Sequence, residues 1–174
     1  MSSNDRFRDA GVATALALLA LSAGVLLDLR AASRVSLGNP LPPSWVFQHM
    51  LVRLATIVTF MAWFDRVYAN LAALGVEAEH GRVWALLQLV IPPLNLFRTP
   101  QLVIEAGTPH HGPRIPVAVV AVWWTLFLAA PVTMLTALPL KDGELIRRLV
   151  ISYGFNAGAG LVGIYILFTL PRIQ

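Results

Sequence analysis

The stretch QLVIPPLNLFRTPQLVIEAG, Gln88–Gly107, decides how many times this chain can cross a membrane. Its residues are apolar enough to enter hydrocarbon, but Pro92 and Pro93 interrupt it, and Asn95 and Arg98 follow. A proline removes a backbone donor, and lipid offers no partner to an amide or a guanidinium. We therefore expect a proline-broken segment that is interfacial or re-entrant, rather than a straight transmembrane helix.

Pro100 predicts a second break in the same segment, after the one at Pro92 and Pro93. The residue before a proline avoids the α-helical region, so we expect Thr99 to cap a short helix that has Pro100 at its first position and ends near Glu105. Asn95 can hydrogen-bond the backbone groups that the two earlier prolines leave without partners. Because transporters build ion and substrate sites from broken helices, this segment is also a candidate site.

The composition places the chain among integral membrane proteins. It is 57% hydrophobic and 13% charged, whereas soluble domains have about 45–50% apolar and about 25% charged residues. The sequence has no cysteine, which excludes disulfides, thiolate metal sites and a cysteine nucleophile. The net charge of +4 is scattered along the chain and forms no basic stripe, so we expect no nucleic-acid partner.

Four further runs are long enough to cross about 30 Å of hydrocarbon. They are residues 10–29, 45–74, 115–138 and 145–170, and the broken segment covers about 83–106. We predict an all-α integral membrane helical bundle, a single membrane domain over 1–174, with four transmembrane helices. A fifth crossing is the alternative if the broken segment spans, and the distribution of Lys and Arg does not separate the two topologies. The first run could also be a signal peptide, but its length favours a retained helix.

Polar residues near the end of the second run form a candidate cluster with the broken segment. Arg66 and Asn70 share one helix face with Trp63, because residues three, four and seven apart lie on the same side. Arg66 is either solvated at the interface or faces the bundle and pairs with a carboxylate, for which Glu105 is our candidate. The predicted cluster comprises Arg66, Asn70, Asn95, Arg98 and Glu105.

Aromatic and polar residues follow one another at fixed offsets through this region. The array runs Trp63, Arg66, Asn70, Leu74, Gly75, Trp84, Ile91, Pro92, Asn95, Leu96, Arg98, Pro100, Glu105, Trp123 and Trp124. From about Phe60 to Trp124 it resembles a bacterial multi-pass membrane domain catalogued as a domain of unknown function. The resemblance implies a protein of the bacterial cytoplasmic membrane and supplies no reaction. Gly107 stands where that family has an aromatic residue, so we expect the preceding helix to end early.

Tryptophans predict where helices meet the membrane surface. Their rings combine an apolar body with an N–H donor, and they gather at the level of the lipid headgroups. We expect this interfacial position for Trp63, Trp84, Trp123 and Trp124.

Small residues in the last run predict a close helix contact. Gly154 and Gly158 form a G-x-x-x-G pattern, and Gly163 continues the series of small residues. Asn156 lies beside them and could hydrogen-bond across the contact. The contact is either intramolecular or the interface of a homo-oligomer.

No motif for catalysis or for cofactor binding is present. His110 and His111 lie near Glu105, but adjacent histidines diverge and no third metal ligand is spaced nearby, so we expect no metal. Nucleophile elbows, P-loops and dinucleotide glycine patterns are absent. We expect no enzyme and no cofactor, but a structural or accessory component whose partners are the lipid bilayer and another membrane protein or a second copy. A small channel or transporter with a polar site at the broken segment is the alternative, and a lipid-directed enzyme is a weaker third.

Overall fold

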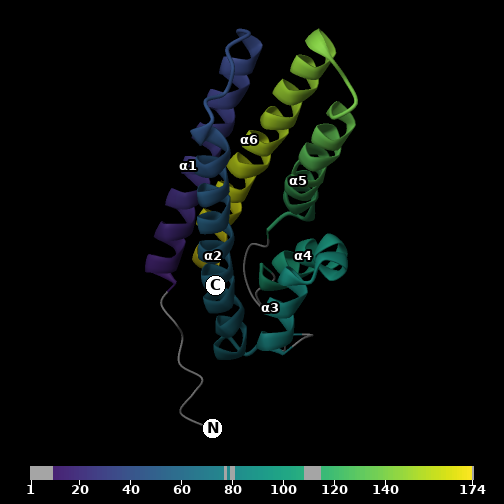
Figure 1. Ribbon diagram of the computed structural model, residues 1–174. Coiled ribbons are helices and arrows are strands. Elements are labelled where there is room, and N and C mark those ends of the chain that lie inside the picture. Colours follow the sequence, from purple (N-terminus) through teal and green to yellow (C-terminus); the bar gives the residue numbers. More distant parts are fainter. Residues whose placement is uncertain (1–9, 77, 79–80, 108–114, 174) are drawn as a thin grey trace.

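The computed structural model describes residues 10–76, 78, 81–107 and 115–173, which form helices and connecting turns without a strand (Figure 1). The helices are α1 Gly11–Ser36, α2 Ser44–Ala73, α3 Arg82–Val90, α4 Pro92–Ala106, α5 Val117–Ala137 and α6 Asp142–Ile173. Within the described residues, the four helices α1, α2, α5 and α6 are long and apolar enough to cross a membrane. The predicted all-α membrane fold with four transmembrane helices is therefore confirmed.

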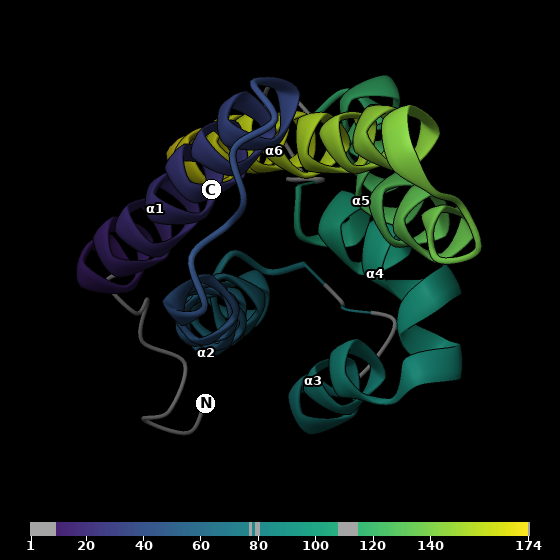
Figure 2. The ribbon, with the colours of Figure 1, turned by 45° about the horizontal axis from the view of Figure 1, so that its top comes forward.

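The four long helices run alternately in opposite directions (Figure 1). The α1–α2 and α5–α6 connections lie at one end of the molecule, and α3 and α4 lie toward the other end. α6 packs between α1 and α5, and these three helices form a curved layer with α2, α3 and α4 on one side of it (Figure 2). This arrangement matches four crossings with the broken segment inserted between the second and the third.

α1 is longer than the predicted run, because a charged residue does not end it. The sequence predicts an end near residue 29, where Asp28 closes the apolar run, but the helix continues to Ser36. Asp28 is fully buried, and so are Ala31 and Val35 one and two turns later. The last turns of α1 therefore pack against neighbouring helices.

α6 begins before its apolar run, at Asp142 rather than near residue 145. Asp142 and Glu144 lie in its first turn, where the helix dipole stabilises carboxylates. Glu144 also accepts hydrogen bonds from Arg147 and Arg148 at 3.0 and 3.1 Å. These interactions stabilise a polar first turn that hydrophobicity alone would not predict.

The break between α3 and α4 is a single residue, Ile91. Its backbone is extended (φ −73°, ψ 112°), which is the conformation that a following proline favours. The Ile91 N–H donates to the Leu87 carbonyl at 3.0 Å, and the Ile91 carbonyl accepts from the Asn95 N–H at 2.8 Å. The chain therefore changes direction while Ile91 keeps both of its backbone hydrogen bonds.

Pro100 does not break helix α4, and the prediction of a second break is wrong. It lies inside α4, which continues to Ala106. Thr99 is not a helix cap, because its hydroxyl donates to the side-chain oxygen of Asn95 one turn earlier. Leu102 and Ala106 in the following turns are almost completely buried. We attribute the intact helix to this packing, which offsets the backbone donor that proline lacks.

The main apolar core lies toward the end that holds α3 and α4. It joins the second half of α2 to α3, α4 and α6 through Trp63, Phe64, Val67, Leu71, Ala85, Leu102, Val103, Ile166 and Leu167. α4 ends at Ala106, as the departure at Gly107 predicts. A Cβ at Gly107 would lie 3.2 Å from Ile115, so the chain returns toward α5 in close contact with this glycine.

The small residues of α6 make contacts within the chain. A Cβ on Gly160 would overlap Val25 of α1, and one on Gly163 would lie 3.0 Å from Leu21 of the same helix. On the other side, a Cβ on Gly158 would lie 3.4 Å from Leu126 of α5. A Cβ added at Gly154 would have no atom of another element within 4 Å, and Gly154 is exposed. Gly154 therefore takes no part in this packing.

Candidate functional site

A cavity of about 430 Å³ lies between the helices and is lined by residues from all six of them. Its volume lies within the range of about 300–1,000 Å³ that small-molecule sites occupy. The lining is mainly apolar and aromatic, with Leu21 of α1, Phe60 of α2 and Ile166 of α6 among its residues. Polar groups reach it at a few positions, which are Arg53, Thr56, Asn95, Thr99 and Asn156.

Exposed lining residues on α2, α3 and α5 indicate an opening of the cavity between these helices. Three of its lining residues stay exposed, Ile57 by 57%, Val90 by 55% and Phe127 by 43%, and each comes from one of these helices. Ile57 lies halfway along the Ser44–Leu71 span and Phe127 halfway along the Val117–Ala137 span. The middle of a transmembrane helix lies in hydrocarbon, so this opening faces lipid tails rather than water.

Aromatic rings from α2 and α5 form one wall of the cavity. Phe60 contacts Trp123 with ring centroids 6.2 Å apart, and this contact bridges the two helices. Trp123 contacts Trp124, and Trp124 stacks on Phe127 with centroids 5.0 Å apart. Trp123 and Trp124 therefore line the cavity, and the interfacial position expected for them stays a prediction.

The other two tryptophans of the predicted interfacial set lie in contrasting places. Trp63 is completely buried in the core, with Phe60 and Phe64 beside its ring. The ring therefore packs inside the protein rather than against lipid, and the interfacial position expected for Trp63 stays a prediction. Trp84 on α3 is 48% exposed, which is compatible with a position at the lipid headgroups.

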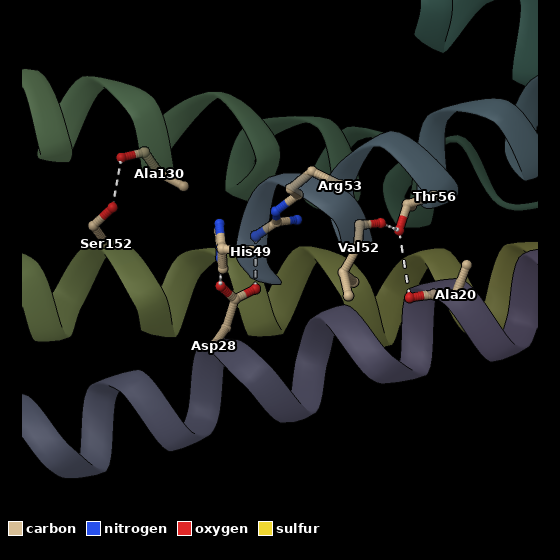
Figure 3. Close-up of polar contacts among 8 residues, drawn as sticks. All are labelled: Ala20, Asp28, His49, Val52, Arg53, Thr56, Ala130 and Ser152. Carbon is tan, nitrogen blue, oxygen red and sulfur yellow. Dashed lines mark hydrogen bonds and ion pairs between the residues drawn. The ribbon is translucent and has the colours of Figure 1, made fainter. Parts of the chain in front are cut away.

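A buried ion pair ties α1 to α2 beside the cavity (Figure 3). Asp28 is completely buried, and its Oδ2 accepts from Arg53 Nη2 at 2.7 Å. Its other oxygen, Oδ1, lies 2.9 Å from His49 Nε2. The carboxylate therefore has a partner on each oxygen, as a charge at this depth requires. The rings of Trp45 and Tyr153 flank His49.

Hydroxyl groups join neighbouring helices close to this ion pair (Figure 3). Thr56 donates to the Val52 carbonyl at 2.8 Å within α2 and lies 3.3 Å from the Ala20 carbonyl of α1. Ser152 of α6 donates to the Ala130 carbonyl of α5 at 2.9 Å. Both hydroxyls are thus used in the packing of the helices.

Three polar side chains on the cavity keep unused hydrogen-bonding groups among the described residues. Asn156 makes no hydrogen bond there, so both of its N–H groups and its carbonyl are available. Asn95 uses its carbonyl for Thr99 and leaves its NH₂ group without a protein partner within the same residues. Arg53 donates one N–H group to Asp28, out of the five that a guanidinium carries.

The structure divides the cluster predicted around the broken segment. Asn95 lines the cavity, whereas the partly exposed Arg98 donates to Gln101 on α4 at 2.8 Å. Glu105 is half-buried and accepts from the Tyr68 hydroxyl at 3.1 Å. Arg66 is exposed and Asn70 is buried, although they lie on the same helix. The proposed pairing of Arg66 with Glu105 stays a prediction.

A second ion pair fixes α3 against α2. Arg82 donates through Nε to Asp65 Oδ1 at 2.6 Å and through Nη2 to Asp65 Oδ2, which gives a bidentate pair. The hydrogen bond to Asp65 raises the pKa of Arg82 above its ordinary value, so the guanidinium keeps its charge. The sequence offered no reason to connect these two residues, which belong to different helices.

Sequence reasoning missed the residues that carry the charge beside the cavity. Arg53 and His49 lie within the predicted run 45–74, and Asp28 lies at the end of the run 10–29, so the sequence alone does not connect them. The signal was present, because His49 and Arg53 are four residues apart on one helix face and an intramembrane cation needs a partner. Asn156 was predicted as a packing residue, and it also lines the cavity.

No group of three or more His, Asp or Glu side chains is close enough to bind a metal in the part of the chain that the structure describes. His110 and His111 lie outside the described residues. The expectation that they hold no metal therefore stays a prediction.

Comparison with known proteins finds one family. The family model described as "Domain of unknown function (DUF4328)" matches residues 29–170. No match was found among curated proteins, and none among solved structures.

Proposed function

This chain belongs to the DUF4328 family, and we propose that it is a non-catalytic component of the bacterial cytoplasmic membrane that binds a lipid-soluble molecule in its cavity. The family description assigns no activity, so the proposal rests on the cavity. Its volume suits a small molecule, its wall is largely apolar and aromatic, and its exposed lining residues Ile57 and Phe127 lie at the middle of two candidate membrane spans.

The chemistry of the cavity supports binding rather than catalysis. Its lining contains no Asp, Glu, His or Ser side chain among the described residues. The hydroxyls of Thr56 and Thr99 already donate to protein oxygens. A general base beside a nucleophile, which most hydrolytic sites require, has no candidate pair on this lining.

A small transporter is the second candidate, and one observation favours it. Asn95 and Thr99 of α4 line the same cavity as Arg53 of α2, so the broken segment does contribute to a site. Transport would require movement of a solute across vesicles that contain the purified protein, which binding alone does not require. Uptake into such vesicles therefore separates the two proposals.

Quenching of tryptophan fluorescence tests the proposed binding directly. Trp123 and Trp124 line the cavity, so methyl 9,10-dibromostearate bound there should quench them. In detergent we expect saturable quenching that unbrominated methyl stearate reverses. Replacing both tryptophans with Phe should remove most of the saturable part. Quenching that rises linearly and resists competition would contradict the proposal.

A matched pair of variants locates the binding at the mouth. Ile57 and Val58 are neighbours on α2 with exposures of 57% and 58%, but only Ile57 lines the cavity. Ile57→Phe should weaken the saturable quenching at least threefold, because the larger ring obstructs the opening. Val58→Phe should leave it unchanged. Equal effects of the two substitutions would place the ligand elsewhere on the protein.

A further inference from the structure

We infer that the bound molecule is a neutral lipid that carries carbonyl oxygens, and this inference rests on the proposed function. The cavity presents an apolar wall together with side chains that mainly offer N–H donors. A ligand that satisfies these donors must bring acceptor oxygens. The ester carbonyl of a neutral acyl lipid has this chemistry.

The donors on the cavity outnumber the acceptors. Asn95 contributes its NH₂ group, because its carbonyl is occupied by Thr99. Asn156 contributes two N–H groups and one carbonyl, and within the described residues none of them has a protein partner. Arg53 adds N–H groups that the single bond to Asp28 does not use. These side chains are partly exposed in the free protein, and an apolar ligand without oxygen would cover their donors and leave them unsatisfied, which costs affinity.

The charge beside the cavity favours a neutral ligand over an anion. Asp28 is completely buried, and its Oδ2 lies 2.7 Å from Arg53 Nη2. Its negative charge offsets the positive charge of Arg53. The ion pair of Arg53 and Asp28 therefore carries no net charge. An anion would therefore lose its hydration without gaining a net opposite charge, whereas a neutral carbonyl needs only the hydrogen bonds.

The positions of the polar groups on the cavity wall indicate where a ligand carries its apolar chain and where it carries its oxygen atoms. Along α2 the lining runs from Arg53 to Met61, which is about 12 Å at 1.5 Å per residue. The residues between are largely apolar, with Ile57 and Phe60 among them. Asn95 adds its polar side chain to the lining from α4, a different helix. The cavity thus suits an apolar chain with oxygen-bearing groups that reach these donors.

Three brominated ligands with the same chain length separate the possibilities. We would measure saturable tryptophan quenching by methyl 9,10-dibromostearate, by 9,10-dibromooctadecane and by ionised 9,10-dibromostearate. We expect the ester to bind at least fivefold more tightly than either of the others. Equal affinity of ester and hydrocarbon would overturn the inference but leave the proposed function standing. Tightest binding of the carboxylate would overturn it in favour of an anionic lipid, and no saturable quenching by any ligand would refute the proposed function as well.

Substitution of the amide tests which group recognises the oxygen. Asn156→Leu keeps the size of the side chain and should reduce affinity for the ester at least fivefold while affinity for the hydrocarbon stays the same or rises. Gln48→Leu removes an exposed amide that does not line the cavity and should change neither affinity. An equal loss for ester and hydrocarbon in Asn156→Leu would show a structural effect and contradict recognition by this amide. The comparison of ligands on the unmodified protein needs no variant, so it decides the inference even if Asn156→Leu fails to fold.

Discussion

Arg53 and Asp28 meet at 2.7 Å between α2 and α1, and the carboxylate is completely buried. Removing one partner leaves a charge without its counterpart in a low-dielectric site. We expect Asp28→Leu to lower the free energy of unfolding in detergent by about 3–5 kcal/mol. The double variant Asp28→Leu, Arg53→Leu should lose less than the sum of the two single losses, because it removes both charges. Additive losses would show that the pair contributes no coupling.

The contact between α1 and α6 gives a prediction with a built-in control. A Cβ at Gly160 would overlap Val25, whereas a Cβ at Gly154 would meet no other element. Gly160→Ala should reduce stability by about 1–3 kcal/mol through overpacking. Gly154→Ala should raise stability by up to about 1 kcal/mol, because alanine is the better helix former. Thermal unfolding in detergent measures both, and a stabilising Gly160→Ala would show that α1 and α6 do not pack this closely.

The bidentate pair of Asp65 and Arg82 predicts a local effect on α3. Lysine cannot form both hydrogen bonds, so Arg82→Lys should loosen α3 while it keeps the charge. The pair is partly exposed, with side-chain exposures of 25% and 38%, so the loss of global stability should stay below about 1 kcal/mol. Hydrogen exchange in α3 should become several times faster than in the unmodified protein.

A control for this exchange experiment comes from the first turns of α6. Arg147 donates to Glu144 from an exposed position, so Arg147→Lys changes the same residue type away from α3. It should leave exchange in α3 unchanged. Unchanged exchange in Arg82→Lys as well would mean that apolar packing alone holds α3.

The sequence was sufficient to predict the architecture, because hydrophobic length and proline position depend on local chemistry. The four spans follow from runs of apolar residues, and the break at Ile91 follows from the proline after it. The prediction at Pro100 was wrong because tertiary burial of Leu102 and Ala106 outweighs a local preference. The backbone preference of a residue before proline is local and does not include the free energy gained when neighbouring side chains are buried.

Much less of the site could be predicted. The bond from Arg53 to Asp28 joins residues 25 positions apart, and the cavity combines side chains from all six helices. Such contacts depend on how helices rotate against one another, which the sequence of one chain does not specify. An amide in an apolar run needs a partner, which makes Asn95 a candidate, and Asn95 lines the cavity. The same argument applies to the carboxylate of Asp28, whose partner cannot be located from the sequence.

The bond from Tyr68 to Glu105 predicts which residue of α2 supports α4. The Tyr68 hydroxyl donates to Glu105 Oε2 at 3.1 Å, and Tyr68 is only 3% exposed. Tyr68→Phe should reduce the free energy of unfolding by about 1.5–3 kcal/mol, the range for a hydrogen bond to a charged group.

Arg66→Gln and Glu105→Gln should each lower thermal stability, and the double change should cost less than their sum if Arg66 also pairs with Glu105. Strictly additive losses in this cycle would show that Arg66 and Glu105 do not interact.

The alternation of the long helices predicts the side of the membrane that each connection faces. The chain has no native cysteine, so single cysteines can report accessibility without a background. With four crossings, cysteines at Gly75 before α3 and at Pro116 after α4 should react with a membrane-impermeant maleimide from the same side. A cysteine at Asn39 between α1 and α2 should react from the opposite side, because α2 separates it from Gly75. Reaction of Gly75→Cys and Pro116→Cys from opposite sides would show that α3 and α4 together cross the bilayer, and it would replace the four-crossing topology with five.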